Sequence, residues 1–309
     1  MDRAPGWTAA DLTDQSGLTF VVTGASSGLG AAITRHLAAR GGRVVMAVRD
    51  TAKGARVRAG LLDAHPRADL VVRRLDLLDL DSVHAFVDGL DRDVDTVDAL
   101  VNNAGIGTVP RRLSPQGVES QFATNHLGHF ALTVRLLPTL TAGRQPVVVT
   151  VSSGLYRLGR LDLSDLAAER RYSAAGAYAT SKLANVLFGL ELDRRLRAVA
   201  SPARSLLTHP GMTRTDLSRD LPPLARRIET VLARPLRRPL DEAAAPMLFA
   251  ATDPSAPTGR HIGPGRRFRR AEPTFAPLRG VATDRRLAAD LWARSEEITG
   301  VRLTPTPLR

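Results

Sequence analysis

The stretch LTFVVTGASSGLGAAITRHLAARG, residues 18–41, decides the fold of this chain. Its first five residues are mostly apolar and rich in strand formers, as in a strand buried on both faces of a sheet. Gly24, Gly28 and Gly30 bracket the turn that follows. An apolar helical face that includes Ile33 comes next and ends at Gly41. The segment therefore predicts a strand, a glycine-rich turn and a helix.

The same alternation continues along the chain. Further strands are expected at residues 43–48, 70–77, 97–105, 146–153, 203–211 and 258–262, and helices at residues 51–63, 81–90, 114–140, 172–199, 241–251 and 284–299. Alternation at this spacing indicates βαβ units and a parallel sheet. We predict an α/β fold, a Rossmann-type doubly wound parallel sheet of about seven strands with helices on both faces, in a single domain.

The ends of the chain are expected to pack on this one domain. Residues 1–17 are interpreted as an N-terminal extension, residues 18–263 as a nucleotide-binding domain that includes a substrate loop at 212–240, and residues 264–309 as a basic loop and C-terminal helix. Residues 224–232 are amphipathic, which suits a lid over a ligand or a packed helix, and membrane contact is a minor alternative. The arginine- and proline-rich residues 264–277 are interpreted as a loop.

Composition narrows the class of protein. The 309 residues carry no cysteine and a formal net charge of +12, and only two of the 43 basic residues, Lys53 and Lys182, are lysine. The arginines are scattered, which favours a solvated surface over a nucleic-acid-binding face. The exception is GPGRRFRR at residues 263–270, which suits either an anionic partner or a solvated loop. No apolar run approaches the length of a membrane span and no apolar signal core precedes the first strand, so a cytoplasmic protein is expected.

The glycine turn suits a pyrophosphate. Glycines let backbone N–H groups approach the phosphates, and the N-terminus of the following helix adds partial positive charge. The spacing G-x-x-x-G-x-G at Gly24, Gly28 and Gly30 differs from the G-x-G-x-x-G fingerprint, and no Gly-Lys-Ser/Thr follows as in a P-loop. The alternative is that these glycines serve only the turn.

Two charged residues bear on the choice of cofactor. Arg49 ends the second strand, where an arginine accommodates a 2′-phosphate and an acid binds the ribose 2′-hydroxyl. Arg49 therefore favours NADP(H) over NAD(H), although Asp50 is adjacent. Asp76 ends the third strand, where its carboxylate could accept a hydrogen bond from adenine. Helix capping together with Asp79 is an equal alternative for Asp76.

Tyr178 and Lys182 are a candidate acid–base pair. Positions four apart share one face of a helix, so both side chains can reach the same space. A neighbouring ammonium favours the phenolate and lowers the pKa of a tyrosine, which then can exchange a proton with a substrate oxygen. Taken alone, the pair is more often a buried tyrosine beside a surface lysine, and the other motifs of the chain decide for the acid–base interpretation.

These motifs together resemble one enzyme superfamily. The segments TGASSGLG at 23–30, NNAG at 102–105, FATNHLGHF around Asn125, VSS at 151–153, YATSK at 178–182 and HPG at 209–211 follow one another in the order seen in short-chain dehydrogenases/reductases. Within that superfamily, AVRD after the second strand, RYSAAGAYATSKLANVLF and HPGMTRTDL resemble the retinol-dehydrogenase-like branch, which includes WW-domain oxidoreductase-like proteins.

The resemblance implies roles for matching residues. Tyr178 would be the general acid/base, Lys182 would lower its pKa and hold the nicotinamide ribose, Ser153 would hydrogen-bond the substrate oxygen, and Asn125 would hold a water that relays protons. Ser152 is the less favoured alternative to Ser153. The implied cofactor contacts are Gly24, Ser26, Ser27, Gly28, Leu29, Gly30, Arg49, Asp76, Leu77, Asn102, Asn103, Ala104, Gly105, Tyr178, Lys182, Pro210, Gly211 and Thr213.

The resulting hypothesis is an NADP(H)-dependent oxidoreductase that interconverts a hydrophobic alcohol and its ketone or aldehyde. The alternative is a nucleotide-binding regulatory protein with the same fold and no turnover. A weaker idea is nucleic-acid binding through Arg266, Arg267, Arg269 and Arg270.

No metal is expected, because His126 and His129 lack a third ligand and suit a packing or polar role. Superfamily members tend to form dimers and tetramers through the helices carrying Asn125 and Tyr178. A homodimer is therefore an option, although the C-terminal extension could block one such face.

Overall fold

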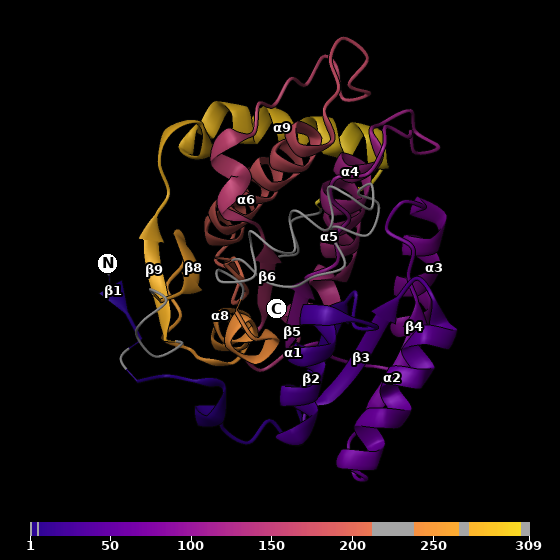
Figure 1. Ribbon diagram of the computed structural model, residues 1–309, viewed down its shortest axis with the longest axis vertical. Coiled ribbons are helices and arrows are strands. Elements are labelled where there is room, and N and C mark those ends of the chain that lie inside the picture. The colour runs from indigo at the N-terminus through magenta and orange to yellow at the C-terminus, as the bar shows by residue number, and fades with distance from the viewer. Residues whose placement is uncertain (1, 5, 212–237, 266–271, 304–309) are drawn as a thin grey trace.

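The computed structural model describes residues 2–4, 6–211, 238–265 and 272–303, and these residues form one sheet covered by helices (Figure 1). The sheet has nine strands in the order β1-β9-β8-β7-β6-β5-β2-β3-β4. The strands are β1 (Asp2–Arg3), β2 (Thr19–Thr23), β3 (Arg43–Val48), β4 (Leu70–Arg74), β5 (Ala99–Asn102), β6 (Val147–Val151), β7 (Arg204–Thr208), β8 (Arg260–Pro264) and β9 (Pro273–Pro277). All neighbours from β4 to β8 are parallel, which confirms the predicted Rossmann-type doubly wound sheet.

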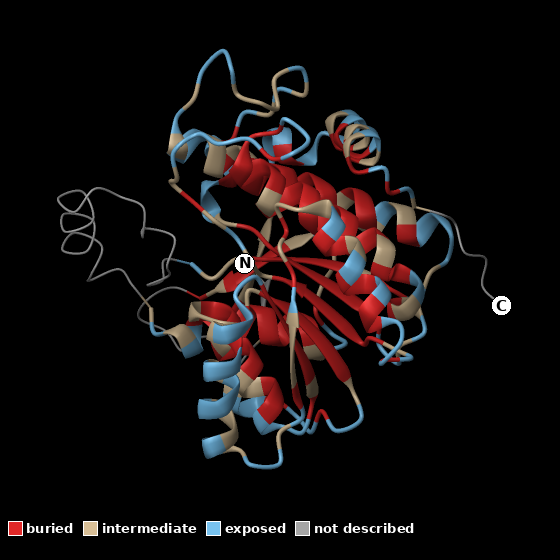
Figure 2. Ribbon diagram, turned by 90° about the vertical axis from the view of Figure 1, so that its right-hand side faces the viewer, coloured by how far each residue is buried: buried red, intermediate tan, exposed pale blue. Residues whose placement is uncertain are grey.

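Helices lie on both faces of the sheet. They are α1 (Gly28–Ala39), α2 (Thr51–Ala64), α3 (Leu80–Leu90), α4 (Ser120–Phe122), α5 (Gly128–Thr141), α6 (Ala174–Ala198), α8 (Leu240–Thr252) and α9 (Arg285–Thr299), with the shorter turns η1 (Ala9–Asp11), η2 (Ala123–Leu127), η3 (Gly154–Leu158) and η6 (Gly280–Thr283). Alternate strand residues point to opposite faces, so Val22 packs with the α1 and α8 side, whereas Val21 packs with the α3 and α5 side. Figure 2 shows the buried strands between helices whose outer faces are exposed.

The location of the site follows from the point in the sheet at which the order of the strands reverses. β2 pairs with β3 on one side and with β5 on the other, and β6 follows β5. In such sheets ligands bind in the crevice at the carboxyl ends of the strands around this switch point. The glycine turn after β2, the NNAG segment after β5 and Ser153 after β6 all emerge at this edge.

The C-terminal part of the sheet differs from the sequence-based expectation. β9 pairs antiparallel with β8, and β1 pairs antiparallel with β9, so the sheet has two strands more than about seven. The interpretation of residues 264–277 as one loop was therefore wrong at β9. The strand was not predicted because its first and last residues, Pro273 and Pro277, are prolines. Prolines are tolerated there because the strand lies near the edge of the sheet.

One helical region departs from the prediction in detail. The helix expected from residue 114 begins at Ser120, because Glu119 accepts hydrogen bonds from the N–H groups of Gln121 and Phe122 and so caps it. Helix α9 crosses α6 (Figure 1), and Trp292 of α9 stacks on Phe188 of α6 at 5.8 Å between ring centroids.

Some predicted features lie outside the described residues. These are Thr213, the amphipathic segment 224–232, and Arg266, Arg267, Arg269 and Arg270. Within the described ranges, no helix is both long and apolar enough to cross a membrane.

Candidate active site

The glycine turn joins β2 to α1 in a conformation that requires glycine. Gly24 has φ +69°, and a Cβ added there would lie 3.0 Å from Ala104 Cα. A Cβ on Gly30 would lie 2.4 Å from the Gly24 carbonyl oxygen, so Gly30 allows the helix to begin close to the turn. Gly28, in contrast, has φ +50° with nothing within 4 Å of an added Cβ, so its backbone borders open space.

The first turn of α1 begins at Gly28 and has no side-chain cap. Ser27 is the N-cap residue, yet its side chain makes no capping hydrogen bond. The N–H groups of Gly28, Leu29 and Gly30 thus have no side-chain cap, and Ser26 and Ser27 lie beside them. A helix N-terminus without a side-chain cap, beside glycines that let a ligand come close to the backbone, fits the pyrophosphate of a dinucleotide.

Thr23 ties the glycine turn to the segment after β5. Its hydroxyl oxygen accepts hydrogen bonds from the N–H groups of Asn103 and Ala104, both at 2.9 Å. The Asn103 amide donates in return to the Thr23 carbonyl oxygen at 2.8 Å. The adjacent Asn102 side chain is 1% exposed and donates to Thr133, so it points into the core and does not line the crevice.

A buried histidine continues this network toward Asn125. His129 Nδ1 lies 3.0 Å from the Asn125 carbonyl oxygen, and Nε2 lies 3.0 Å from Thr23 Oγ1. Burial lowers the pKa of His129 to about 4, so the ring is neutral. A carbonyl oxygen only accepts, so Nδ1 carries the hydrogen, Nε2 accepts, and the Thr23 hydroxyl donates to it. Sequence reasoning left His129 with a general packing or polar role and missed this link.

Asn125 is held by three side-chain hydrogen bonds. Its Oδ1 accepts from Ile106 N, and its Nδ2 donates to the Ile106 carbonyl oxygen and to Ser181 Oγ, at 2.8 to 2.9 Å. Asn125 lies in η2, a single π-helical turn between α4 and α5, and such turns are frequent at functional sites. The side chain therefore fixes the segment that follows Gly105.

Ser153, Tyr178 and Lys182 meet beside this segment. Ser153 caps η3, and its side chain hydrogen-bonds the Tyr178 phenol. Lys182 Nζ donates to the Val151 carbonyl oxygen at 3.1 Å and lies 5.7 Å from the centre of the Tyr178 ring. Ser152 is buried and donates to the Lys182 carbonyl oxygen, so its hydroxyl faces the core and Ser153 alone of the two contacts Tyr178.

Burial governs the ionisation of this pair. It raises the pKa of Tyr178 to about 12, against a lowering effect of the Ser153 hydrogen bond. Burial also lowers the pKa of Lys182 to about 8. We expected the ammonium to lower the pKa of Tyr178, but in this structure desolvation outweighs any such effect and favours the neutral form of both groups.

The residues expected to select the cofactor lie at the ends of β3 and β4. Arg49 is exposed at the end of β3, whereas Asp50 caps α2 by accepting from Lys53 N at 2.9 Å. Asp76 accepts from Leu78 N, and Asp79 caps α3 through Asp81 N. Asp76 thus forms a local turn while remaining partly exposed, and the neighbouring Leu77 is buried.

The HPG segment after β7 also has a specific geometry. Gly211 has φ +71°, and its N–H donates to His209 Nδ1 at 3.2 Å across Pro210. The His209 ring packs at a tilt against His261 of β8, with ring centroids 4.4 Å apart. Burial lowers the pKa of His209 to about 4, so this ring is neutral as well.

His126 belongs to the core rather than to this site. Its Nε2 lies 2.9 Å from Ser295 Oγ of α9, and its ring packs against Phe122 and Phe188. Among the residues that the structure describes, no group of three or more His, Cys, Asp or Glu side chains could hold a metal ion.

Comparison with known proteins identifies the family. The short chain dehydrogenase family model matches residues 19–224. The chain is a short-chain dehydrogenase/reductase. Retinol dehydrogenase 14 of Mus musculus is 36% identical over 299 residues, covering 92% of this chain and 86% of that protein. Polyprenol dehydrogenase of Mus musculus is 37% identical over 298 residues, covering 94% and 86%.

Solved structures agree on the fold. A crystal structure of an uncharacterized protein from Mycobacterium Paratuberculosis is 43% identical, covers 97% of this chain and 99% of that chain, and has a TM-score of 0.78. A short chain dehydrogenase from Shigella flexneri 2a complexed with NADP is 21% identical, covers 80% and 95%, and has a TM-score of 0.61.

The chain therefore belongs to the retinol-dehydrogenase-like branch of short-chain dehydrogenases/reductases. It is an oxidoreductase that acts on CH–OH donors or the corresponding carbonyls with a nicotinamide cofactor. The predicted enzyme class is confirmed.

Proposed function

We propose that this short-chain dehydrogenase/reductase uses NADP(H) in preference to NAD(H) and interconverts a hydrophobic alcohol and its ketone or aldehyde, with Tyr178 as the general acid/base. The observation that carries this proposal is the interaction of the Ser153 side chain with the Tyr178 phenol, with Lys182 Nζ 5.7 Å from the centre of the Tyr178 ring. Two neighbouring hydroxyl groups can both donate to one carbonyl oxygen, where negative charge develops during reduction.

The glycine turn and α1 would hold the cofactor pyrophosphate, and the segment at Gly105 and the HPG segment would border its other half. When bound, the cofactor supplies or accepts the hydride. A Cβ added at Gly105 would lie 3.6 Å from Lys182 Nζ, so the lysine reaches the space beside this segment, where a ribose would lie.

Proton transfer falls to the side chains of this chain. In the reductive direction Ser153 and Tyr178 donate hydrogen bonds to the carbonyl oxygen, and Tyr178 then gives up its proton. The charge of Lys182, protonated below its pKa of about 8, stabilises the phenolate that results. In the oxidative direction the same phenolate removes the proton of the alcohol.

The preference for NADP(H) rests on Arg49. Its guanidinium is exposed at the end of β3, while the carboxylate of Asp50 is engaged in capping α2. A guanidinium there can pair with a 2′-phosphate, and a capping carboxylate is poorly placed to bind a 2′-hydroxyl.

A hydrophobic substrate is supported by the surface next to Ser153. Leu155 and Leu158 of η3 are 47% and 71% exposed, which places apolar side chains just after the reactive serine. The relatives named retinol dehydrogenase and polyprenol dehydrogenase point to long apolar alcohols as the class to test. A cytoplasmic location remains a prediction from the sequence.

The test combines cofactor titration with turnover. NADPH and NADH are titrated by fluorescence into the wild type, Arg49→Gln and the matched control Arg286→Gln, which alters an exposed arginine of α9. A panel of carbonyl compounds graded from short aldehydes to retinal and isoprenoid aldehydes follows. We expect tighter binding of NADPH than of NADH, loss of that preference in Arg49→Gln alone, and faster turnover of the longer apolar compounds. Tight cofactor binding without turnover of any panel member would instead favour the nucleotide-binding regulatory protein.

A further inference from the structure

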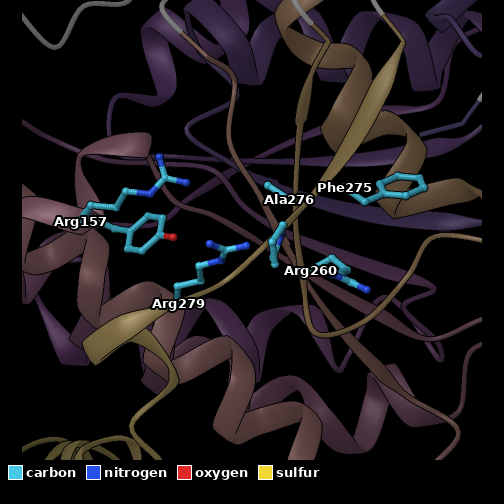
Figure 3. Close-up of a pocket in the computed structure, with 7 residues that line it drawn as sticks. Arg157, Arg260, Phe275, Ala276 and Arg279 are labelled. Carbon is cyan, nitrogen blue, oxygen red and sulfur yellow. The ribbon is translucent and has the colours of Figure 1, made fainter. Parts of the chain in front are cut away.

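A pocket of about 630 Å³ lies between η3 and the antiparallel end of the sheet. It is lined by Tyr156 and Arg157 of η3, Arg260 of β8, Phe275, Ala276 and Pro277 of β9, and Arg279, which follows β9. Arg157, Arg260 and Arg279 come from three separate segments of the chain that meet at this pocket (Figure 3). Its volume is within the range of small-molecule sites.

These three arginines have no acidic partner among the residues that the structure describes. Other arginines do, since Arg135, Arg170 and Arg197 pair with carboxylates at 2.6 to 2.9 Å. No carboxylate of the described residues lies within 4 Å of the arginines that line the pocket, in a chain with 31 acidic residues. Three guanidinium groups that line one pocket without a counter-charge repel one another, so an anion bound in the pocket would relieve that repulsion.

Tyr156 provides a second, independent indication. Its side chain is only 2% exposed, yet its hydroxyl has no hydrogen-bond partner among the described residues. The hydroxyl oxygen is not among the polar atoms that are closed off from solvent, so it is open to a ligand in the pocket. The ring is fixed between His261, at 5.3 Å, and the Arg157 guanidinium, at 5.4 Å, so the unpaired hydroxyl belongs to a rigid part of the pocket wall.

We propose that this pocket binds a small polyvalent anion, of the carboxylate or phosphate class, between Arg157, Arg260 and Arg279, with the Tyr156 hydroxyl as an additional donor. Guanidinium groups pair with both kinds of anion through two parallel hydrogen bonds. The donor set holds only positive and neutral donor groups, which excludes metal cations and favours ligands with two or more negative charges.

This pocket is separate from the place proposed for the cofactor phosphates. Its strands β8 and β9 are at the far side of the sheet from β3, which carries Arg49, and five strand spacings separate β8 from β3. At roughly 4.8 Å for each spacing, the two places are about 24 Å apart. Tyr156, however, is in the same short turn that Ser153 caps, so an anion here would contact the segment that carries the proposed reactive serine.

The anion could be a separate small molecule or the acidic end of a substrate held at Ser153. Calorimetric titration with citrate and with inorganic phosphate tests the first source, at constant ionic strength and with saturating NADPH to occupy the glycine turn. The double variant Arg157→Gln/Arg279→Gln removes two donors, and Tyr156→Phe removes the hydroxyl but keeps the ring. The matched control is Arg285→Gln/Arg286→Gln, two exposed arginines at the start of α9.

We expect citrate to bind the wild type and the control with affinities within about twofold of each other. Binding should weaken by about tenfold or more in the double arginine variant and by roughly threefold in Tyr156→Phe, in keeping with charge-assisted and neutral hydrogen bonds respectively. Equal weakening in the control would mean that net charge alone attracts the anion and would overturn the proposal.

The second source is tested by turnover and depends on the proposed function. Pairs of aldehydes of equal length, with and without a terminal carboxylate, are compared at each variant. If the substrate carries the anion, the KM of the carboxylated member alone rises in Arg157→Gln/Arg279→Gln. If neither citrate nor phosphate binds and this KM ratio is unchanged, the pocket has no anion-binding role. The calorimetric titration requires no turnover. A negative result there would therefore argue against the anion site without contradicting the proposed cofactor and proton chemistry.

Discussion

Replacement of Thr23 by valine should destabilise the protein although valine has nearly the same shape. Thr23 is fully buried, and its hydroxyl donates to His129 Nε2 while accepting from the N–H groups of Asn103 and Ala104. Valine keeps the volume and removes the hydroxyl. Asn103 N retains the Val101 carbonyl oxygen as a partner, so the groups left unpaired are His129 Nε2 and Ala104 N.

The size of the effect follows from these two groups. A buried polar atom that loses its partner costs about 1–3 kcal/mol. Because His129 is 2% exposed, the loss of its partner should lower the free energy of unfolding by the full amount. The loss at Ala104 should lower it by less, because Ala104 is partly exposed. We expect a total of about 2–4 kcal/mol for Thr23→Val. Thr23→Ser keeps the hydroxyl and loses one buried methyl group, at about 1 kcal/mol.

Equilibrium unfolding in urea measures both variants. The serine variant should be more stable than the valine variant by about 1–3 kcal/mol, the reverse of the order that burial of apolar surface alone predicts. NADPH binding should weaken in Thr23→Val, because the contact of the glycine turn with Ala104 shifts, and should stay near wild type in Thr23→Ser. A valine variant as stable as the serine variant would refute the role assigned to this hydroxyl.

Further predictions concern cofactor choice, ionisation and assembly. Arg49→Gln should raise the Kd for NADPH by about tenfold and leave the Kd for NADH unchanged, as fluorescence titration will report, and an equal change in both would contradict the 2′-phosphate contact. Burial lowers the pKa of Lys182 to about 8, so the native protein releases this proton between pH 8 and pH 10.5 while the unfolded chain keeps it. The free energy of unfolding should therefore rise with pH across that window, by up to about 3 kcal/mol relative to Lys182→Met. A pH-independent difference between the wild type and Lys182→Met in urea unfolding would show that the lysine is not desolvated. Because α9 covers α6 through Trp292, light scattering after size-exclusion chromatography should give the monomer mass of 33.2 kDa, and a dimer whose hydrogen-exchange footprint maps to α6 would contradict this expectation.

Local sequence patterns were enough to predict the centre of this fold. The glycine turn at 23–30 is predictable because its conformation depends on residues adjacent in sequence, and the strand–helix alternation follows from short apolar runs. Tyr178 and Lys182 are predictable as neighbours because helical periodicity alone brings them together. Ser153 could be favoured over Ser152 by resemblance, and the structure adds the reason, since Ser152 donates to the Lys182 carbonyl oxygen.

Contacts between distant segments were beyond such patterns. Thr23 and His129 are 106 positions apart, and nothing in either local sequence indicates that they share a hydrogen bond. β9 escaped prediction because its ends are prolines and its pairing partner, β8, lies across a segment of high arginine content. The ionisation of Tyr178 was misjudged for a related reason, since burial depends on the whole fold and not on the spacing to Lys182.

The most direct test of the central claim compares the wild type with Tyr178→Phe in single-turnover reduction of a carbonyl substrate by NADPH. The substitution removes only the phenolic hydroxyl, so the Kd for NADPH should change by less than about threefold, while the rate of the chemical step should fall by about 10²–10⁴. That combination would establish Tyr178 as the proton donor. A Tyr178→Phe variant that binds NADPH and still reduces the substrate at the wild-type rate would contradict the account.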